Sequence, residues 1–244
     1  MRIAIMQPTY LGWIGYFSLI DRVDAFVFHD DVKYNHQSWQ QRNRIKTQDG
    51  PMWLTVPVLT SGRSGQLILE AEINDEENWE HKHQASIHTN YASAQYLSDL
   101  GDWLDETYSQ DWTSLCDLNV HVVTTLADKL EIEADFVFAS ELDLEGRKAH
   151  KLIKICNALG ADEYFSPLGS KDYIESDNPF PDAGINLFYQ HYDHPTYSQL
   201  HGEFISHLSV IDLLMNEGPD SLSIIREGQK TPYTSEEARD IDID

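Results

Sequence analysis

The chain has 244 residues, with 41 acidic residues against 17 basic ones and a formal net charge of -24. Such a charge argues against nucleic acid as the main partner, because an acidic surface repels the phosphate backbone. Hydrophobic residues still make up 41% of the chain, which is enough apolar surface for a folded core and excludes general disorder. Acidic residues spread along the whole chain are typical of proteins adapted to high salt, where self-repulsion is screened.

Cysteine usage and hydropathy predict a cytoplasmic protein. Cys116 and Cys156 lie far apart within helical patterns, as buried free thiols do. The N-terminal apolar run is short and is interrupted by Gln7 and Pro8, so neither a signal peptide nor membrane insertion is expected. These features leave open whether the chain forms oligomers.

The start of the chain predicts a βαβ unit with polar groups at the carboxyl ends of both strands. Residues 2–6 form an apolar run that ends at Gln7, residues 14–20 have a helical pattern, and residues 25–28 form a second apolar run before Asp30. Open α/β sheets bind ligands at this edge. Gly12 and Gly15 would let the backbone approach a phosphate at the helix N-terminus, although a plain tight turn is the alternative.

The rest of the chain extends the α/β pattern. Residues 76–130 lack strand signals and predict a helical insertion or cap, while residues 228–244 are acidic and predict a mobile tail. The other expected elements are strands at 53–58, 135–139, 163–166 and 186–191 and helices at 147–159 and 209–216. We therefore expect one α/β domain over residues 1–227, with a Rossmann-like parallel sheet and an inserted helical cap.

The scarce cations indicate where an anion would bind. Arg42, Arg44 and Lys171 are expected past the carboxyl ends of sheet strands, where an arginine fork or an ammonium group can bind phosphate or carboxylate. The alternative is that the arginines pair with Asp30 and Asp31 and only brace the loop. Both arrangements are compatible with the sequence.

A second loop of small residues lies after the strand at 163–166. Ser166, Gly169 and Ser170 precede Lys171 at the start of a helical pattern, so this loop could offer backbone N–H groups to an anion. Two such loops, each following a strand of a βαβ unit, could hold the two ends of one nucleotide.

Asp30 and His201 are the candidate general bases. His201 stands in a Gln-Leu-His-Gly segment, and the alternative for it is a capping or core histidine. Asp30 and Asp31 could hold Mg²⁺ beside a triphosphate, although adjacent carboxylates on an extended chain face opposite ways. The spacing of His81, His83 and His88 does not suit a metal site, and none is expected.

A set of segments spread over almost the whole chain carries a family resemblance. The segments are Met6-Gln7-Pro8-Thr9-Tyr10, Trp13-Ile14-Gly15-Tyr16-Phe17, Leu19-Ile20, Asp30-Asp31-Val32, Arg42-Asn43-Arg44-Ile45, Lys82-His83, Gly169 with Lys171-Asp172-Tyr173, Gln199-Leu200-His201 and residues 208–214. Together they resemble the WbqC-like protein family. This resemblance implies a role in surface-polysaccharide or O-antigen assembly, with a glycine transferase activity on a sugar.

A looser resemblance connects the first and second loops to pantothenate synthetase and related nucleotidyltransferases. The resemblance implies a Rossmann-like sheet of the nucleotidyltransferase kind. Because those enzymes join a carboxylic acid to an amine through an acyl-adenylate, it also implies ATP with Mg²⁺ as the cofactor. The two histidines of their first motif are Trp13 and Tyr16 here, so either arginines supply the missing charge or the ATP chemistry is absent.

Together these features predict a transferase or ligase that attaches glycine or a similar small acid to an amino sugar or sugar nucleotide. One alternative is a non-catalytic carbohydrate or sugar-nucleotide binding protein, supported by aromatic residues near the loops, and another is a sugar-nucleotide transferase that does not use ATP. The catalytic candidates are Asp30, Arg44 and His201. The candidates for binding substrate or nucleotide are Gln7, Pro8, Tyr10, Gly12, Trp13, Gly15, Tyr16, Arg42, Asn43, Ser166, Gly169, Ser170 and Lys171.

Overall fold

The computed structural model describes residues 1–242 and has a six-stranded sheet at its centre. Its strands lie in the order β5-β2-β1-β6-β7-β8, and all neighbours are parallel except β7 and β8. This is a Rossmann-like α/β fold, as the sequence predicts, and the chain order reverses between β1 and β6. The strands are β1 (Arg2–Met6), β2 (Ala25–Phe28), β5 (Asp135–Phe138), β6 (Glu163–Ser166), β7 (Asn186–Tyr189) and β8 (Tyr233–Thr234).

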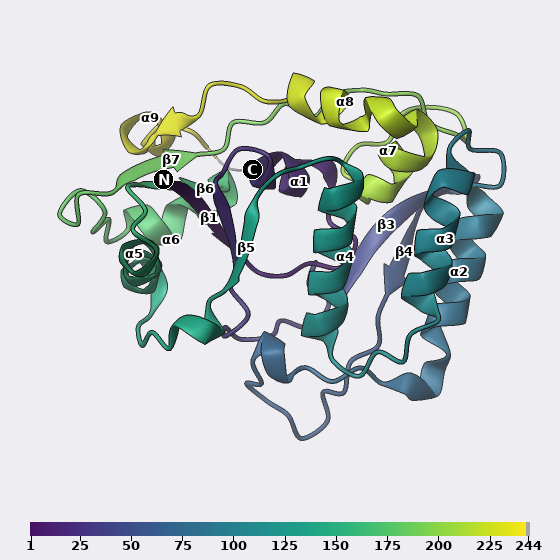
Figure 1. Cartoon of the computed structure of the whole chain (residues 1–244), viewed down its shortest axis with the longest axis horizontal. Helices are drawn as coiled ribbons and strands as arrows, with labels where there is room; N and C mark the ends of the chain where they lie inside the picture. Colours follow the sequence, from purple (N-terminus) through teal and green to yellow (C-terminus); the bar gives the residue numbers. More distant parts are fainter. Residues whose placement is uncertain (243–244) are drawn as a thin grey trace.

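The sheet is covered by helices on both faces because its central strands carry apolar side chains on both sides. In β1, Ala4 joins one core cluster, while Ile3 and Ile5 join the other. Helices α1 (Ile14–Ile20), α7 (Val210–Glu217) and α8 (Ser221–Glu227) belong to the first cluster, and α5 (Lys148–Leu159), α6 (Lys171–Glu175) and α9 (Ser235–Arg239) to the second (Figure 1). The sheet, with its carboxyl edge, therefore lies between two layers of helices.

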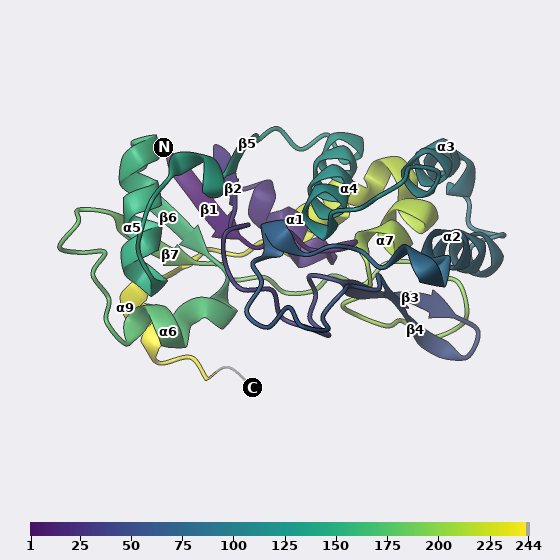
Figure 2. The ribbon, with the colours of Figure 1, turned by 90° about the horizontal axis from the view of Figure 1, so that it is seen from below.

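The segment between β2 and β5 forms a lateral extension of the domain. It contains an antiparallel hairpin of β3 (Arg42–Thr47) and β4 (Gly50–Thr55), and then α2 (Trp79–Asn90), α3 (Leu97–Tyr108) and α4 (Leu115–Lys129). Helices α2 and α3 lie at the end of the molecule opposite α5 and α6 (Figure 2). Helices thus do occupy residues 76–130. Residues 53–55 of the strand expected at 53–58 lie in β4, which begins earlier and forms a hairpin with β3 in the polar stretch at Arg42.

In the segment where the sequence predicts a mobile tail, residues 233–239 form β8 and α9. Tyr233 pairs with Tyr189 at the edge of the sheet, and α9 begins with a capping box formed by Thr234 and Glu237. Residues 243 and 244, which the same expectation included, lie outside the described residues. Short 3-10 helices occur at η1 (Ile68–Glu70), η2 (Asp75–Glu77), η3 (Ser140–Leu142), η4 (Leu168–Ser170) and η5 (Gly218–Asp220).

No helix within residues 1–242 is both long enough and apolar enough to cross a lipid bilayer.

Candidate functional site

A cavity of about 540 Å³ lies at the carboxyl edge of the sheet, where the order of the strands reverses. Ligands bind at this place in open α/β sheets, and the volume is that of a small-molecule site. The ends of β1, β2 and β6 supply one wall, and α5, α6 and the loop before β3 supply the others. The lining residues are Ile5, Met6, Gln7, Thr9, His29, Val32, Ser38, Trp39, Gln40, Lys148, Leu152, Pro167, Gly169, Ser170 and Tyr173.

His29 is the histidine that lines this cavity, and the carboxylate of Asp31 lies next to it. It follows β2 directly, and its Nε2 atom lies 3.7 Å from Asp31 Oδ1. The other oxygen of Asp31 accepts a hydrogen bond from the buried ammonium of Lys151 on α5. Neither His29 Nε2 nor Asp31 Oδ1 has a hydrogen-bond partner in the described structure. The three side chains are therefore consecutive neighbours, and His29 is the one that lines the cavity.

Burial controls the charge of His29. Desolvation lowers the pKa of its imidazole to about 4, against the opposing effect of Asp31 and with a further lowering by Lys151. The ring is therefore neutral at pH 7 and can accept a proton. Because Asp31 lies beside it, the imidazolium formed by that proton would be stabilised by a fixed negative charge.

Polar groups on the other walls can orient a ligand. Gln40 Nε2 donates to Gln7 Oε1 over 2.7 Å, which fixes both side chains at the end of β1. Gly169, Ser170 and Tyr173 face the same space from the loop and helix that follow β6. The cavity thus combines an apolar floor with a few placed polar groups, the usual composition of a small-molecule site.

The structure brings together only part of the predicted set. Gln7, Gly169 and Ser170 line one cavity although they come from the two separate βαβ units. Pro8 is buried beside Gln7, and its carbonyl accepts a hydrogen bond from Asn119 over 3.3 Å. The remaining predicted residues lie outside the lining.

The glycine loop before α1 faces the protein interior rather than the cavity. A Cβ atom at Gly15 would lie 2.1 Å from the indole of Trp13, so this glycine makes room for a side chain. The carbonyl of Gly12 accepts from the Val210 amide over 2.9 Å. Trp13 itself stacks on His207 with ring centroids 4.8 Å apart. Close packing therefore accounts for this glycine spacing.

Two further residues of this region connect the loop to the lateral extension. Tyr10 is fully buried, and its hydroxyl bonds His83 Nδ1 over 2.8 Å and the Tyr108 hydroxyl over 2.5 Å. The amide of Asn43 donates to the Leu11 carbonyl over 2.6 Å. Tyr16 is also buried, and its hydroxyl donates to the Gln7 carbonyl over 3.1 Å, which supports the end of β1.

Arg42 and Arg44 lie within β3 and not past a strand of the central sheet. The Arg42 guanidinium lies over the Trp53 ring at 4.3 Å, and Arg44 Nη2 donates to the His207 carbonyl over 3.1 Å. Neither arginine pairs with Asp30 or Asp31, so the bracing alternative is wrong. The reason is the hairpin, which carries β3 away from the end of β2.

Asp30 and His201 both have other partners. Asp30 is 3% exposed and its two oxygens accept from the Ser140 amide over 3.0 Å and the Ser140 hydroxyl over 2.5 Å. The Nε2 atom of His201 contacts the Asn90 carbonyl over 2.7 Å, on the lateral extension. Asp30 holds the start of η3, and His201 holds the end of α2. Neither residue lines the cavity.

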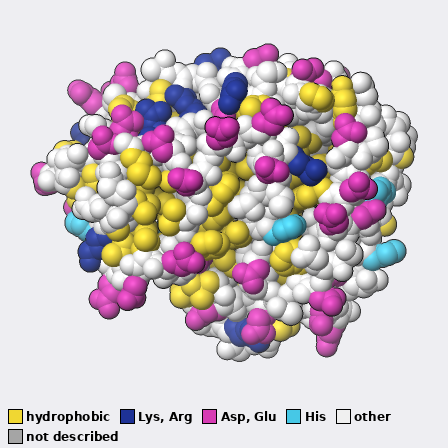
Figure 3. Space-filling view, in the orientation of Figure 1, with side chains coloured by type: hydrophobic (Ala, Val, Ile, Leu, Met, Phe, Trp, Pro, Cys, Tyr) yellow, Lys and Arg dark blue, Asp and Glu magenta, His cyan; other side chains and the backbone are white. Residues whose placement is uncertain are grey.

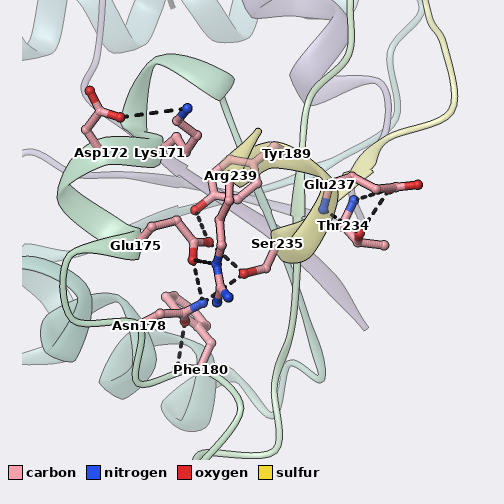
Figure 4. Close-up of polar contacts among 10 residues, drawn as sticks. All are labelled: Lys171, Asp172, Glu175, Asn178, Phe180, Tyr189, Thr234, Ser235, Glu237 and Arg239. Atoms are coloured by element: carbon pink, nitrogen blue, oxygen red, sulfur yellow. Dashed lines mark hydrogen bonds and ion pairs between the residues drawn. The ribbon is translucent and has the colours of Figure 1, made fainter. Parts of the chain in front are cut away.

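Lys171 is directed to the C-terminal segment. Its ammonium donates to the Ile241 carbonyl and lies 3.9 Å from Asp172 (Figure 4). Ser166 is fully buried at the end of β6. Because α6 has only one turn and a half, its N-terminus offers little dipole to an anion.

The described residues contain no group of three or more His, Cys, Asp or Glu side chains that could hold a metal ion. Both oxygens of Asp30 accept hydrogen bonds from Ser140, and one oxygen of Asp31 accepts a hydrogen bond from Lys151. The role in holding Mg²⁺ that the sequence suggests for these two carboxylates stays a prediction.

Sequence reasoning missed His29, Asp31 and Lys151 as a unit. The available signal was the position of His29, which follows β2 as Gln7 follows β1. Alternation after the strand turns His29 and Asp31 to one side and Asp30 to the other. Lys151 had no signal, because it reaches Asp31 across 120 positions of sequence.

The fold defines a doubly wound α/β protein with a cavity at the switch point of its sheet. The chain belongs to the WbqC-like protein family, which it matches over residues 7–224. It is also similar to the uncharacterized protein Rv1507c of Mycobacterium tuberculosis strain H37Rv, with 34% identity over 231 residues, 93% of this chain and 99% of the relative. No solved structure matches the chain.

Proposed function

We propose that the protein is a transferase or ligase that attaches glycine or another small amino acid to an amino sugar or sugar nucleotide in surface-polysaccharide biosynthesis. Membership of the WbqC-like family supports the link to polysaccharide assembly. The observation that carries the chemical part is His29, a neutral imidazole in a cavity with Asp31 behind it. The pair provides a proton acceptor where a ligand can reach it.

In the proposed reaction the amine of the sugar attacks the carbonyl carbon of an activated amino acid. A C–N bond forms, the bond between the carbonyl carbon and its leaving group breaks, and the amine proton passes to His29. Asp31 stabilises the imidazolium, and Lys151 keeps Asp31 in position through its hydrogen bond. His29 thus takes the role of general base that the sequence suggests for Asp30 or His201.

The activating step is proposed to use ATP with Mg²⁺, with an acyl-adenylate as the activated acid. The carboxylate of the amino acid would attack the α-phosphorus and release pyrophosphate. Mg²⁺ would arrive bound to the triphosphate, because Asp30 and Asp31 are both engaged. Transfer from a sugar nucleotide without ATP is the alternative for this step.

Incubation of the purified protein with ATP, glycine and amino sugars tests the proposal. We expect pyrophosphate release and a sugar whose mass has increased by one glycyl group. His29→Gln should lower the rate by about 10²- to 10⁴-fold, the usual contribution of a general base, and Asp31→Asn should lower it less. His81→Gln, an exposed histidine on α2, is the matched control.

A rate that is unchanged in His29→Gln would remove the assigned base. Binding of the sugar without any product, under all of these conditions, would favour the non-catalytic binding protein. The aromatic walls of the cavity, Trp39 and Tyr173, are the feature that this second function would use.

A further inference from the structure

An exposed aromatic surface adjoins the cavity. Trp39 and Trp53 are 47% and 43% exposed, and their ring centroids are 5.5 Å apart. The Arg42 guanidinium lies over Trp53 at 4.3 Å. We call these three residues the tryptophan platform. Two adjacent indoles left in water are uncommon on a protein surface and mark a place where a ligand binds.

The platform carries positive charge without acidic partners. Within residues 1–242, Arg42 has no carboxylate at ion-pair distance, although the chain contains 41 acidic residues. The hairpin register places Arg44 directly opposite Trp53, and the buried Nε of Arg44 has no hydrogen-bond partner. A local excess of cations next to exposed indoles favours a ligand with both a flat ring and negative charge.

The platform is continuous with the His29 cavity through Trp39. This residue lines the cavity and also contacts Trp53, and its neighbour Gln40 lines the cavity as well. The chain then passes through Gln41 directly to Arg42 at the start of β3. One ligand can therefore contact the cavity and the platform together.

We propose that the tryptophan platform binds the base and diphosphate of a nucleotide whose remaining part lies in the cavity beside His29. A nucleobase stacks on an indole face, and the guanidinium groups bind the phosphate oxygens. This inference rests on the proposed function and specifies its substrate, since a sugar nucleotide and ATP both carry this group. A free sugar lacks both the base and the phosphates.

Isothermal titration and tryptophan fluorescence with defined probes test the platform. The probes are UDP, UDP-N-acetylglucosamine, ATP and free N-acetylglucosamine. We expect the nucleotides to bind and to quench fluorescence. Trp39→Ala and Trp53→Ala should each weaken nucleotide binding by about tenfold or more, while Trp53→Phe should keep most of the affinity. Arg42→Gln should weaken the binding of UDP and leave any binding of N-acetylglucosamine unchanged.

The controls are Leu69→Ala for loss of an exposed apolar side chain and Lys82→Gln for loss of an exposed cation. Thermal melts of all variants establish that they fold. Preference for UDP-N-acetylglucosamine over ATP would identify the sugar nucleotide as the ligand, and the reverse would identify ATP. Nucleotide binding that is equal in wild type, Trp39→Ala and Trp53→Ala would overturn the platform, as would no nucleotide binding at all.

The two proposals fail separately. Loss of nucleotide binding in the platform variants, together with no glycyl transfer by the wild type, would support the platform and refute the transferase. Transfer that depends on His29 but is unaffected by Trp39→Ala and Trp53→Ala would support the transferase and refute the platform.

Discussion

His83 shows how one buried residue couples the fold to pH. It lies on α2, is 5% exposed, and its Nδ1 atom bonds the hydroxyl of Tyr10 in the loop after β1. Desolvation lowers the pKa of the imidazole to about 4, and burial does the same for His29. Both histidines are therefore neutral in the folded protein at pH 7.

The pH dependence of stability follows from these lowered pKa values. Between the unfolded pKa of about 6.5 and the folded pKa of about 4, the unfolded chain binds protons that the folded chain does not. The free energy of unfolding should therefore fall as pH drops through this window, by up to about 3 kcal/mol for His83 alone. Urea titrations at pH 7 and pH 4.5 measure this.

His83→Gln is the variant that isolates the effect, because its amide can still accept from Tyr10. In this variant the free energy of unfolding should decrease less between pH 7 and pH 4.5 than in the wild type, by the amount due to His83. An identical decrease in both proteins would contradict the lowered pKa of His83.

At the residue scale, the sequence indicates the edge of the sheet where the site lies but not the side chains that meet there. Gln7 and the Gly169–Ser170 pair could be found, because Gln7 directly follows an apolar strand and the pair lies in the loop just after another. The sequence does not place Arg42 and Arg44 correctly, because their hairpin lies in a polar stretch without a strand signal. The roles of Asp31 and Lys151 depend on the docking of α5, which no local pattern encodes.

Helix α1 depends on the packing of Trp13 against Gly15, a glycine for which the sequence predicts a role in ligand binding. All seven of its residues are buried, and the lack of a side chain at Gly15 leaves room for the Trp13 indole. Gly15→Ala should cost about 1–3 kcal/mol of stability, because the new methyl group would overlap the indole. Chemical denaturation measures the change.

Gly101→Ala is the matched control for this substitution. A Cβ atom at Gly101 would meet nothing within 4 Å, and the residue lies inside α3, so alanine should stabilise the protein by about 0.5–1 kcal/mol. If Gly15→Ala kept full stability but lost ligand binding, the ligand interpretation of this loop would be restored.

The C-terminal elements are held by the Glu175 carboxylate. It accepts from Arg239 Nε over 2.9 Å, Ser235 Oγ over 2.7 Å, Tyr189 Oη over 2.9 Å and Asn178 Nδ2 over 3.0 Å (Figure 4). Burial alone would raise the pKa of this carboxyl, but these hydrogen bonds outweigh burial and lower it. One side chain of α6 thus joins β7 to α9.

Glu175→Ala should therefore release residues 233–242 from the sheet. We expect a loss of about 2–3 kcal/mol and faster amide exchange in this segment, because hydrogen bonds to a charged group are lost together. Glu236→Ala, on α9 and without a hydrogen bond to its side chain in the described structure, should change neither. Unchanged exchange in Glu175→Ala would show that β8 holds the segment without the carboxylate.

At the element scale, long periodic segments are predictable and short polar ones are not. The helix at Lys148–Leu159 ends at Gly160, which has a φ of 69°, as its sequence indicates. The hairpin alternates Arg42, Arg44 and Lys46 with Asn43 and Ile45, so its strand pattern is concealed by charged residues. The sequence predicts a mobile C-terminal segment because no local pattern reveals its polar contacts with the distant Glu175.

At the scale of the whole molecule, negative charge is the dominant electrostatic feature. Acidic side chains are spread over the face shown in Figure 3, with few Lys or Arg side chains between them. Several cations are held by a single carboxylate, as in the pairs Arg226–Asp21 and Arg63–Glu72. Most acidic groups are therefore left to repel one another across the surface.

This repulsion leads to a prediction for salt. The Debye length shortens from about 30 Å at 0.01 M to about 3 Å at 1 M ionic strength, so KCl should remove most of the repulsion between exposed carboxylates. Salt also weakens the exposed ion pairs, but each such pair contributes only about 0–1 kcal/mol, whereas a formal charge of -24 acts over the whole surface. The net effect should be stabilisation.

A gain of about 3 kcal/mol corresponds to a rise in Tm of roughly 10 °C for a chain of this size. Thermal melts in 0.01 M and 1 M KCl at pH 7 measure this rise, and sorbitol at equal osmolality controls for exclusion of cosolute from the surface. A Tm that is flat between the two salt concentrations, or that rises equally in sorbitol, would show that screening of the acidic surface does not stabilise the fold.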